Sequence, residues 1–176
     1  MNLDYGKFYG RITSGIRSGA HGREILNATD RFLAGVMYAA YPALLLRLVC
    51  GKLLQRGGFR EAVTTALPYL LIPGVSFVLL SIIRDRMNWK RPYEEWPIDP
   101  LICREKKGHS MPSRHVFSAA VISMCILRQN AALGGICLGL SACIAAVRVL
   151  GGVHYPRDVI AGYLIGVAEG SLLWIV

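Results

Sequence analysis

The sequence predicts an all-α membrane protein, a helical transmembrane bundle of about five spans preceded by an N-terminal interfacial amphipathic helix. Hydrophobic residues make up 53% of the 176 residues, and the mean hydropathy is +0.41, both higher than a soluble domain of this size requires. Three stretches also lack charge, over 15, 22 and 17 positions at residues 32–46, 62–83 and 131–147. Such lengths approach the ~20 residues that cross hydrocarbon. A soluble bundle with buried helices is the weaker alternative, because several of these stretches occur in one short chain.

The first predicted element is an amphipathic helix over residues 3–18. Apolar side chains recur there at intervals of four, at Phe8, Ile12 and Ile16. Three basic side chains, Lys7, Arg11 and Arg17, lie elsewhere on the helical wheel. The helix is therefore too polar to span and is expected to lie at the interface. Tyr5 and Tyr9 are expected at headgroup level, and a disordered tail is the alternative.

Five spans are predicted to follow, at residues 32–50, 61–83, 112–127, 131–149 and 156–175. The first has candidate N-caps just before it, Asn27, Thr29 and Asp30. Residues 1–176 are expected to form a single membrane-embedded domain, with 1–30 as the interfacial segment and 32–176 as the bundle. The chain has five cysteines, an odd number without metal-ligand spacing, so we expect small core residues and not a disulfide framework.

Five spans assign every connection to one of two sides of the membrane. Side A holds the N-terminus, the long segment 84–111 and the turn 148–156. Side B holds loop 51–60, turn 128–130 and the C-terminus. Three segments that are distant in sequence therefore bring cationic or titratable side chains together at side A: Arg84, Arg91, Arg114, His115, Arg148 and His154.

Such a cluster predicts an anion site at a membrane surface. Guanidinium groups match phosphate oxygens in a bidentate manner, and a helix start near Pro112 adds free N–H groups and a positive dipole end. The net charge of +9 does not indicate nucleic acid here. The basic residues flank apolar stretches, which suits anionic lipid headgroups, so we expect a lipid phosphate substrate and membrane lipids as partners.

The two histidines predict phosphoryl transfer as well as binding. A neutral imidazole can attack phosphorus, and a protonated one can protonate a leaving oxygen. Asp158 follows His154 by four residues, a separation that lets the carboxylate reach the imidazole and fix its tautomer. His115 is then the expected general acid for the leaving group.

Three motifs in order resemble the signature of the type-2 phosphatidic acid phosphatase family of lipid phosphatases, in particular its small bacterial integral membrane members, related in fold to vanadium haloperoxidases. They are "RDRMNWKRP" at 84–92, "PSRH" at 112–115 and "RVLGGVHYPRD" at 148–158. The resemblance implies that His154 is a nucleophile forming a phosphohistidine, that Asp158 orients it and that His115 is the acid. It also implies that the phosphate is bound without a metal or other cofactor, by Arg84, Arg91, Ser113 and Arg148.

This sequence departs from the family pattern in four respects. Arg84 stands where Lys is usual, and Val147 where Ser is usual. Arg114 replaces the usual Gly, and we expect it to contact a second phosphate or the headgroup. Family members often have six spans whereas five are predicted here, so the N-terminal helix is a candidate substitute for the first.

The resemblance implies hydrolysis of a lipid phosphomonoester or diphosphate. The candidates are an isoprenoid diphosphate such as undecaprenyl diphosphate, phosphatidylglycerol phosphate and phosphatidic acid. Two alternatives are a non-catalytic phospholipid-binding scaffold and an anion transporter, of which the transporter predicts charge at several depths. Glu169 is the one carboxylate expected near mid-bilayer, where a structural pairing, toward Arg47 for example, is favoured over proton relay.

Orientation is predicted from the short basic loop on side B, which contains Lys52, Arg56 and Arg60. Short basic loops stay in the cytoplasm, and the family's bacterial members commonly face outward. We therefore expect a bacterial plasma-membrane protein with an extracytoplasmic active site.

Overall fold

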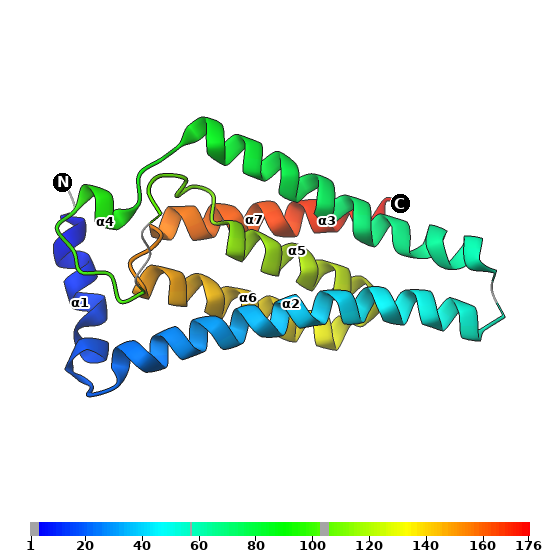
Figure 1. Cartoon of the computed structure of the whole chain (residues 1–176), viewed down its shortest axis with the longest axis horizontal. Helices are drawn as coiled ribbons and strands as arrows, with labels where there is room; N and C mark the ends of the chain where they lie inside the picture. The colour runs from blue at the N-terminus through cyan, green and yellow to red at the C-terminus, as the bar shows by residue number, and fades with distance from the viewer. Residues whose placement is uncertain (1–3, 57, 103–105) are drawn as a thin grey trace.

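The computed structural model describes residues 4–56, 58–102 and 106–176, and in those ranges its regular secondary structure is helical, with no strand. The helices are α1 (Tyr5–Ser18), α2 (Gly22–Leu54), α3 (Phe59–Met87), α4 (Pro92–Glu95), α5 (Arg114–Gln129), α6 (Ala131–Leu150) and α7 (Pro156–Ser171), and a short 3-10 turn, η1 (Leu172–Trp174), ends the chain. Figure 1 shows α2, α3, α5, α6 and α7 running roughly parallel to one long axis. The predicted all-α bundle is confirmed.

Three helical stretches are long and apolar enough to cross a membrane, namely Gly22–Leu54, Phe59–Glu95 and Ala131–Leu150. The other two predicted spans, α5 and α7, are present as helices of 16 residues each. At 1.5 Å per residue they rise about 24 Å, short of the ~30 Å of the hydrocarbon core. Both helices are thus shorter than free-standing spans.

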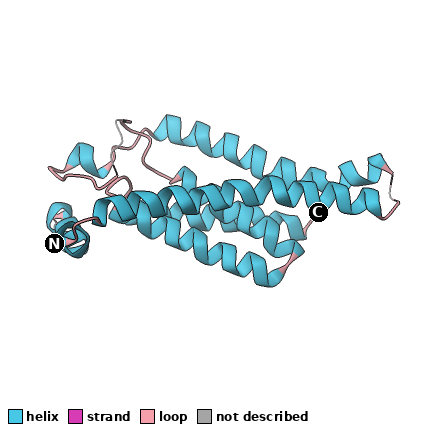
Figure 2. Ribbon diagram, turned by 60° about the horizontal axis from the view of Figure 1, so that its bottom comes forward, coloured by secondary structure: helices cyan, strands magenta, loops and turns pink. Residues whose placement is uncertain are grey.

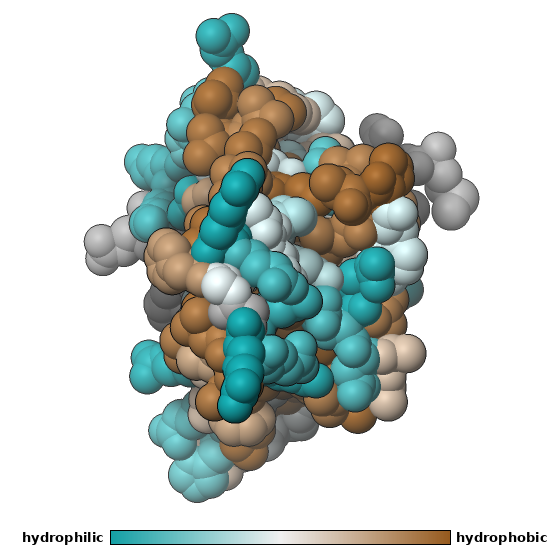
Figure 3. All heavy atoms as spheres, turned by 90° about the vertical axis from the view of Figure 1, so that its right-hand side faces the viewer, coloured by the Kyte–Doolittle hydropathy of each residue, from teal (hydrophilic) through white to brown (hydrophobic). Residues whose placement is uncertain are grey.

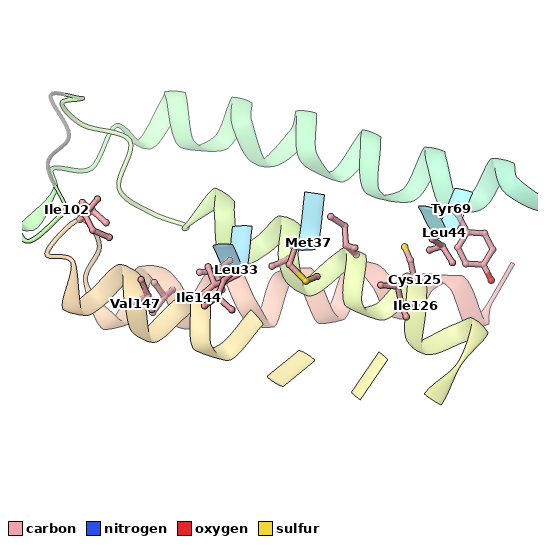
Figure 4. Close-up of a cluster of buried hydrophobic side chains, with 14 of the residues drawn as sticks. Leu33, Met37, Leu44, Tyr69, Ile102, Cys125, Ile126, Ile144 and Val147 are labelled. Atoms are coloured by element: carbon pink, nitrogen blue, oxygen red, sulfur yellow. The ribbon is translucent and has the colours of Figure 1, made fainter. Parts of the chain in front are cut away.

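The short α5 is the central helix of the bundle. From Val116 to Ile126 every residue but Ser118 is buried, and α5 packs against α2, α3, α6 and α7. Figure 4 shows part of the resulting core, in which Leu44 of α2 lies near Cys125 of α5. Because neighbouring helices surround α5, its length does not have to match the thickness of the lipid.

A glycine stripe lets α7 lie directly against α5. A Cβ atom at Gly162 would come within 2.6 Å of the Ser113 carbonyl oxygen, and one at Gly166 within 2.7 Å of the Phe117 carbonyl oxygen. A Cβ atom at Gly170, four residues further on, would come within 2.3 Å of the Met124 Cβ atom. Small residues spaced by four bring helix backbones together in membranes. The contact fixes the start of α7 beside the start of α5.

The start of α2 corrects one prediction. The helix begins at Gly22, so Asn27, Thr29 and Asp30 lie inside it and none is its N-cap. Its first turns are stabilised by contacts with segment 96–102, where Arg23 donates to Asp99 and Asn27 donates to the Leu101 carbonyl, at 2.9 and 3.0 Å. These tertiary contacts extend the helix past its local capping signals.

The N-terminal helix α1 forms as predicted, but its tyrosines face the protein. Tyr9 is 1% exposed, donates to the Leu150 carbonyl at 3.1 Å and accepts from the Leu101 N–H at 3.3 Å. The Tyr5 ring lies 4.7 Å from that of Tyr155. Both rings therefore contact the protein, which the sequence pattern did not predict. Figures 1 and 2 show α1 lying across the end of the bundle.

The assignment of connections to two sides is confirmed. The N-terminus, α1, α4 and the loops before α5 and α7 gather at one end in Figure 1, and the C-terminus lies toward the other. Figure 3 faces side B, where hydrophilic and hydrophobic surfaces alternate. Within the bundle, Glu169 accepts from the Ser76 hydroxyl at 2.9 Å, so the expected pairing with Arg47 is wrong. The four described cysteines are free, and Cys103 lies outside the described residues.

Candidate active site

A cavity of about 360 Å³ opens at side A and contains five of the eight predicted site residues. They come from the end of α3, the segment after it, the first turn of α5 and the loop before α7. The predicted residues that line the cavity are Arg84, Arg91, Arg114, His115 and His154. The fold therefore brings all three sequence motifs to one opening.

Two buried arginines form the inner wall of this cavity. Arg84 and Arg91 are only 7% and 6% exposed. The Arg84 guanidinium donates to the carbonyls of His109 and Pro112. Arg91 donates from Nε to the Gly108 carbonyl at 3.0 Å and from a terminal nitrogen to the Val153 carbonyl at 3.1 Å. Both positive charges are thereby fixed in place by backbone groups.

His154 and Asp158 are adjacent beneath this wall. His154 Nδ1 lies 3.7 Å from Asp158 Oδ2, and the two residues are 2% and 0% exposed. The distance exceeds that of a hydrogen bond, but catalytic hydrogen bonds are often long before substrate binds. The four-residue spacing that predicted this pair does place the carboxylate on the Nδ1 side of the ring.

The Asp158 carboxylate accepts hydrogen bonds from two groups other than His154. Its Oδ2 accepts from the Ser110 hydroxyl at 2.5 Å and from the Tyr155 N–H at 3.0 Å. Its own carbonyl accepts from the Ser113 N–H at 2.8 Å, which joins the start of α7 to the start of α5. Asp158 is therefore anchored independently of His154.

Burial sets the protonation state of His154. It lowers the pKa of the imidazole to about 4, an effect opposed by Asp158 and reinforced by the positive charges of Arg91 and Arg84. The ring is therefore neutral at pH 7. A neutral imidazole has the free lone pair that attack on phosphorus requires.

The predicted residues Arg148 and Ser113 lie behind the cavity lining. Arg148 is 1% exposed, and its Nε lies 3.0 Å from Oδ1 of Asp30, a carboxylate on α2 that is 7% exposed. Ser113 is fully buried, and its hydroxyl has no hydrogen-bond partner among the described residues. Asp30 is thus a charged residue next to the site, although the sequence indicated only a candidate N-cap at this position.

Arg114 and His115, at the start of α5, face the open part of the cavity. Arg114 is exposed, and its guanidinium carbon lies 5.1 Å from the centre of the Phe77 ring on α3. His115 is half-buried and also borders a small apolar recess between α2 and α5. The two side chains connect the polar cavity with the apolar part of the bundle.

Sequence reasoning missed several residues at the site. The cavity is also lined by Asp85, Lys106, Lys107, Gly108 and His109. His109 Nδ1 faces Asp85 Oδ1 at 3.1 Å. Lys106, Lys107 and His109 belong to the long segment 84–111, whose unusual length was the only available signal. Across the described ranges, no three His, Cys, Asp or Glu side chains gather as metal ligands would.

Comparisons with known proteins concern the fold and the family of this chain. The chain shares its fold with LpxE of Aquifex aeolicus, at 20% identity and a TM-score of 0.73 over 100% of this chain and 97% of that one. A PAP2-type phosphatidylglycerolphosphate phosphatase from Bacillus subtilis matches at 19% identity and a TM-score of 0.56, over 96% and 91%. No curated protein matches by sequence. The model of the PAP2 superfamily matches residues 65–176, which include all three motifs, and the chain therefore belongs to the PAP2 superfamily.

Proposed function

We propose that this integral membrane phosphatase hydrolyses a lipid phosphomonoester or diphosphate through a phosphohistidine formed on His154. The observation that carries the proposal is the neutral His154 next to Asp158 in a cavity walled by Arg84 and Arg91. A nucleophile, its orienting acid and an anion site are the elements that phosphoryl transfer requires.

In the first step, His154 Nε2 attacks the phosphorus of the bound lipid. Asp158 stabilises the imidazolium that forms, as the acid of a catalytic triad does. Arg84 and Arg91 balance the charge on the phosphoryl oxygens, and their backbone contacts keep them oriented before substrate arrives. We assign Ser113 and Arg148 to phosphate binding too, with Asp30 orienting the Arg148 guanidinium through its Nε.

His115 protonates the departing oxygen of the lipid. Water then attacks the phosphohistidine and releases inorganic phosphate, which restores His154. No metal takes part in this scheme. The candidate substrates are an isoprenoid diphosphate, phosphatidylglycerol phosphate and phosphatidic acid.

The active site is proposed to face away from the cytoplasm, because the short basic loop of side B suits the cytoplasmic face. A green fluorescent protein fused to the C-terminus on side B should then fluoresce, whereas a periplasmic reporter enzyme fused there should be inactive. The opposite pair of results would reverse the orientation.

The test is phosphate release from these lipids in detergent, with and without EDTA. His154→Ala should lower kcat by about 10⁴-fold or more, because the covalent step is lost. His21→Ala, which alters an exposed histidine outside the cavity, is the matched control and should not change it. Wild-type protein given ³²P-labelled lipid should also form an acid-labile phosphoprotein that His154→Ala lacks.

Release that survives His154→Ala, or that EDTA abolishes, contradicts the mechanism. Binding of the lipids without release from any of them would instead support the phospholipid-binding scaffold, and passage of an anion across sealed vesicles would support the transporter.

A further inference from the structure

The cations that line the cavity occupy two depths. Arg84 and Arg91 are buried, whereas Lys106, Lys107 and Arg114 are exposed at the opening. We call these last three residues the rim. Asp85 is the only carboxylate among the described lining residues, and it faces His109. No member of the rim forms an ion pair within 4.0 Å with a carboxylate of the described residues.

One phosphate group leaves this rim unbalanced. A phosphomonoester carries about two negative charges at neutral pH, which the two charges of Arg84 and Arg91 match. The three rim charges then face the same opening with Asp85 as the one carboxylate among the described lining residues, which leaves an excess of positive charge. Like charges gathered around one opening repel each other, so the arrangement favours a ligand with further negative charge next to its scissile phosphate.

Arg114 lies between the polar cavity and an apolar groove. Its guanidinium lies over the ring of Phe77, 5.1 Å from the ring centre. Phe77 also lines an apolar groove of about 340 Å³ formed by side chains of α2, α3 and α5. A charged group held by Arg114 would therefore lie between the buried phosphate site and the groove.

On these grounds, and resting on the function proposed above, we propose that the rim binds a second phosphoryl group joined to the scissile one, so that the preferred substrate is a lipid diphosphate. His154 Nε2 forms a bond to the terminal phosphorus while the bond from that phosphorus to the bridging oxygen breaks. The electron pair of the broken bond stays on the lipid monophosphate, whose growing charge the rim stabilises. Water then cleaves the phosphohistidine, so that lipid diphosphate and water give lipid monophosphate and inorganic phosphate.

The experiment compares farnesyl diphosphate with farnesyl monophosphate, which share one tail, in phosphatidylcholine vesicles. The test variants are Arg114→Gly, which restores the family's usual residue, and Lys106→Gln with Lys107→Gln. Each should lower kcat/KM for the diphosphate about 10-fold more than for the monophosphate, since a charge-assisted contact is lost only with the diphosphate. Arg86→Gln removes an equal charge from an exposed position of α3 outside the cavity lining and should leave the ratio unchanged.

A second arm replaces part of the phosphatidylcholine with phosphatidylglycerol, because anionic headgroups of the membrane could supply the same charge. If the variants lower both activities equally, or differ from wild type only in phosphatidylglycerol vesicles, the rim binds the membrane surface and the diphosphate proposal is wrong. If the wild-type protein hydrolyses neither compound nor any other lipid phosphate, the proposed function itself is wrong. Hydrolysis of both with an unchanged ratio overturns only the role of the rim.

Discussion

The inner and outer halves of the cavity hold positive charge in two different ways. In the inner half, Arg84 and Arg91 are buried and donate to backbone carbonyls of two loops, the one before α5 and the one before α7. On the rim, Arg114 projects over an aromatic ring, and its neighbours Lys106 and Lys107 are exposed. The inner charges are oriented by the fold before any ligand binds, and such preorganisation is the main source of electrostatic catalysis. The rim depends on its ligand for counter-charge, so it suits selection among substrates.

The same contrast separates the two acids that accompany the site. Asp158 is fully buried and fixed by Ser110 and the Tyr155 N–H, next to the proposed nucleophile. Asp85 is exposed and pairs with His109 on the cavity wall. Substitutions in the inner half should therefore impair chemistry, whereas substitutions outside it should alter preference or salt dependence.

The largest expected effect in this comparison comes from Asp158→Asn. The substitution keeps the shape of the side chain but removes the charge that stabilises imidazolium, so kcat should fall between about 10²- and 10⁴-fold. Single-turnover assays of phosphoprotein formation measure the affected step directly. Ser110→Ala, which removes one hydrogen bond to that carboxylate, should cost about 10-fold.

Asp85→Asn is the matched control, since it removes a carboxylate of the same cavity outside the triad-like pair. It should change kcat less than about threefold, as expected for an exposed pair. An Asp85 effect equal to that of Asp158 would show that charge alone, and not position beside His154, determines the role of Asp158.

The next effect concerns stability and the buried pair of Asp30 and Arg148. Asp30→Asn leaves a guanidinium that is 1% exposed without its carboxylate, which should cost about 3 kcal/mol or more of unfolding free energy. Denaturation in mixed micelles measures this cost. Asp99→Asn, which breaks an ion pair whose carboxylate is 66% exposed, should cost less than about 1 kcal/mol.

A double substitution completes this test. Asp30→Asn combined with Arg148→Gln should recover much of the lost stability, because neither charge of the pair is then buried. Equal costs for Asp30→Asn and Asp99→Asn would contradict the expectation that the buried pair contributes more to stability than the exposed one.

Motif spacing sufficed to predict where the inner residues meet. His154 and Asp158 follow one another across a turn, and alternation of spans brings Arg84, Arg91 and His115 to the same side. Each of these relations depends on nearby sequence or on simple topology. Asp30 could not be found in this way. Its partner lies on another helix, and its local sequence resembles a helix cap.

The remaining errors share a tertiary cause. Tyr9 has the amphipathic character of an interface residue, but two backbone groups of distant segments satisfy its hydroxyl inside the protein. Ser110 reaches Asp158 because the loop before α5 folds over the start of α7. The only sequence feature that indicates the close contact of α5 and α7 is the spacing of the α7 glycines by four. Such contacts depend on the packing of elements that local patterns describe one at a time.

The smallest expected effect is the pH dependence that burial of His154 imparts. Its pKa is lowered to about 4 in the folded protein, below the ordinary value of 6.5, so the folded state binds fewer protons than the unfolded state between these values. Stability should therefore be complete above about pH 6.5 and decline as pH falls toward 4. Asp158, Arg84 and Arg91 are the charged groups that act on this ring. Thermal melts at pH 7 and pH 5 should show a decrease of several degrees in wild type and a smaller decrease in His154→Gln, which has no group to titrate. Equal decreases in both proteins would mean that His154 does not lose its proton affinity on folding, and that the inner half is less shielded from water than its geometry indicates.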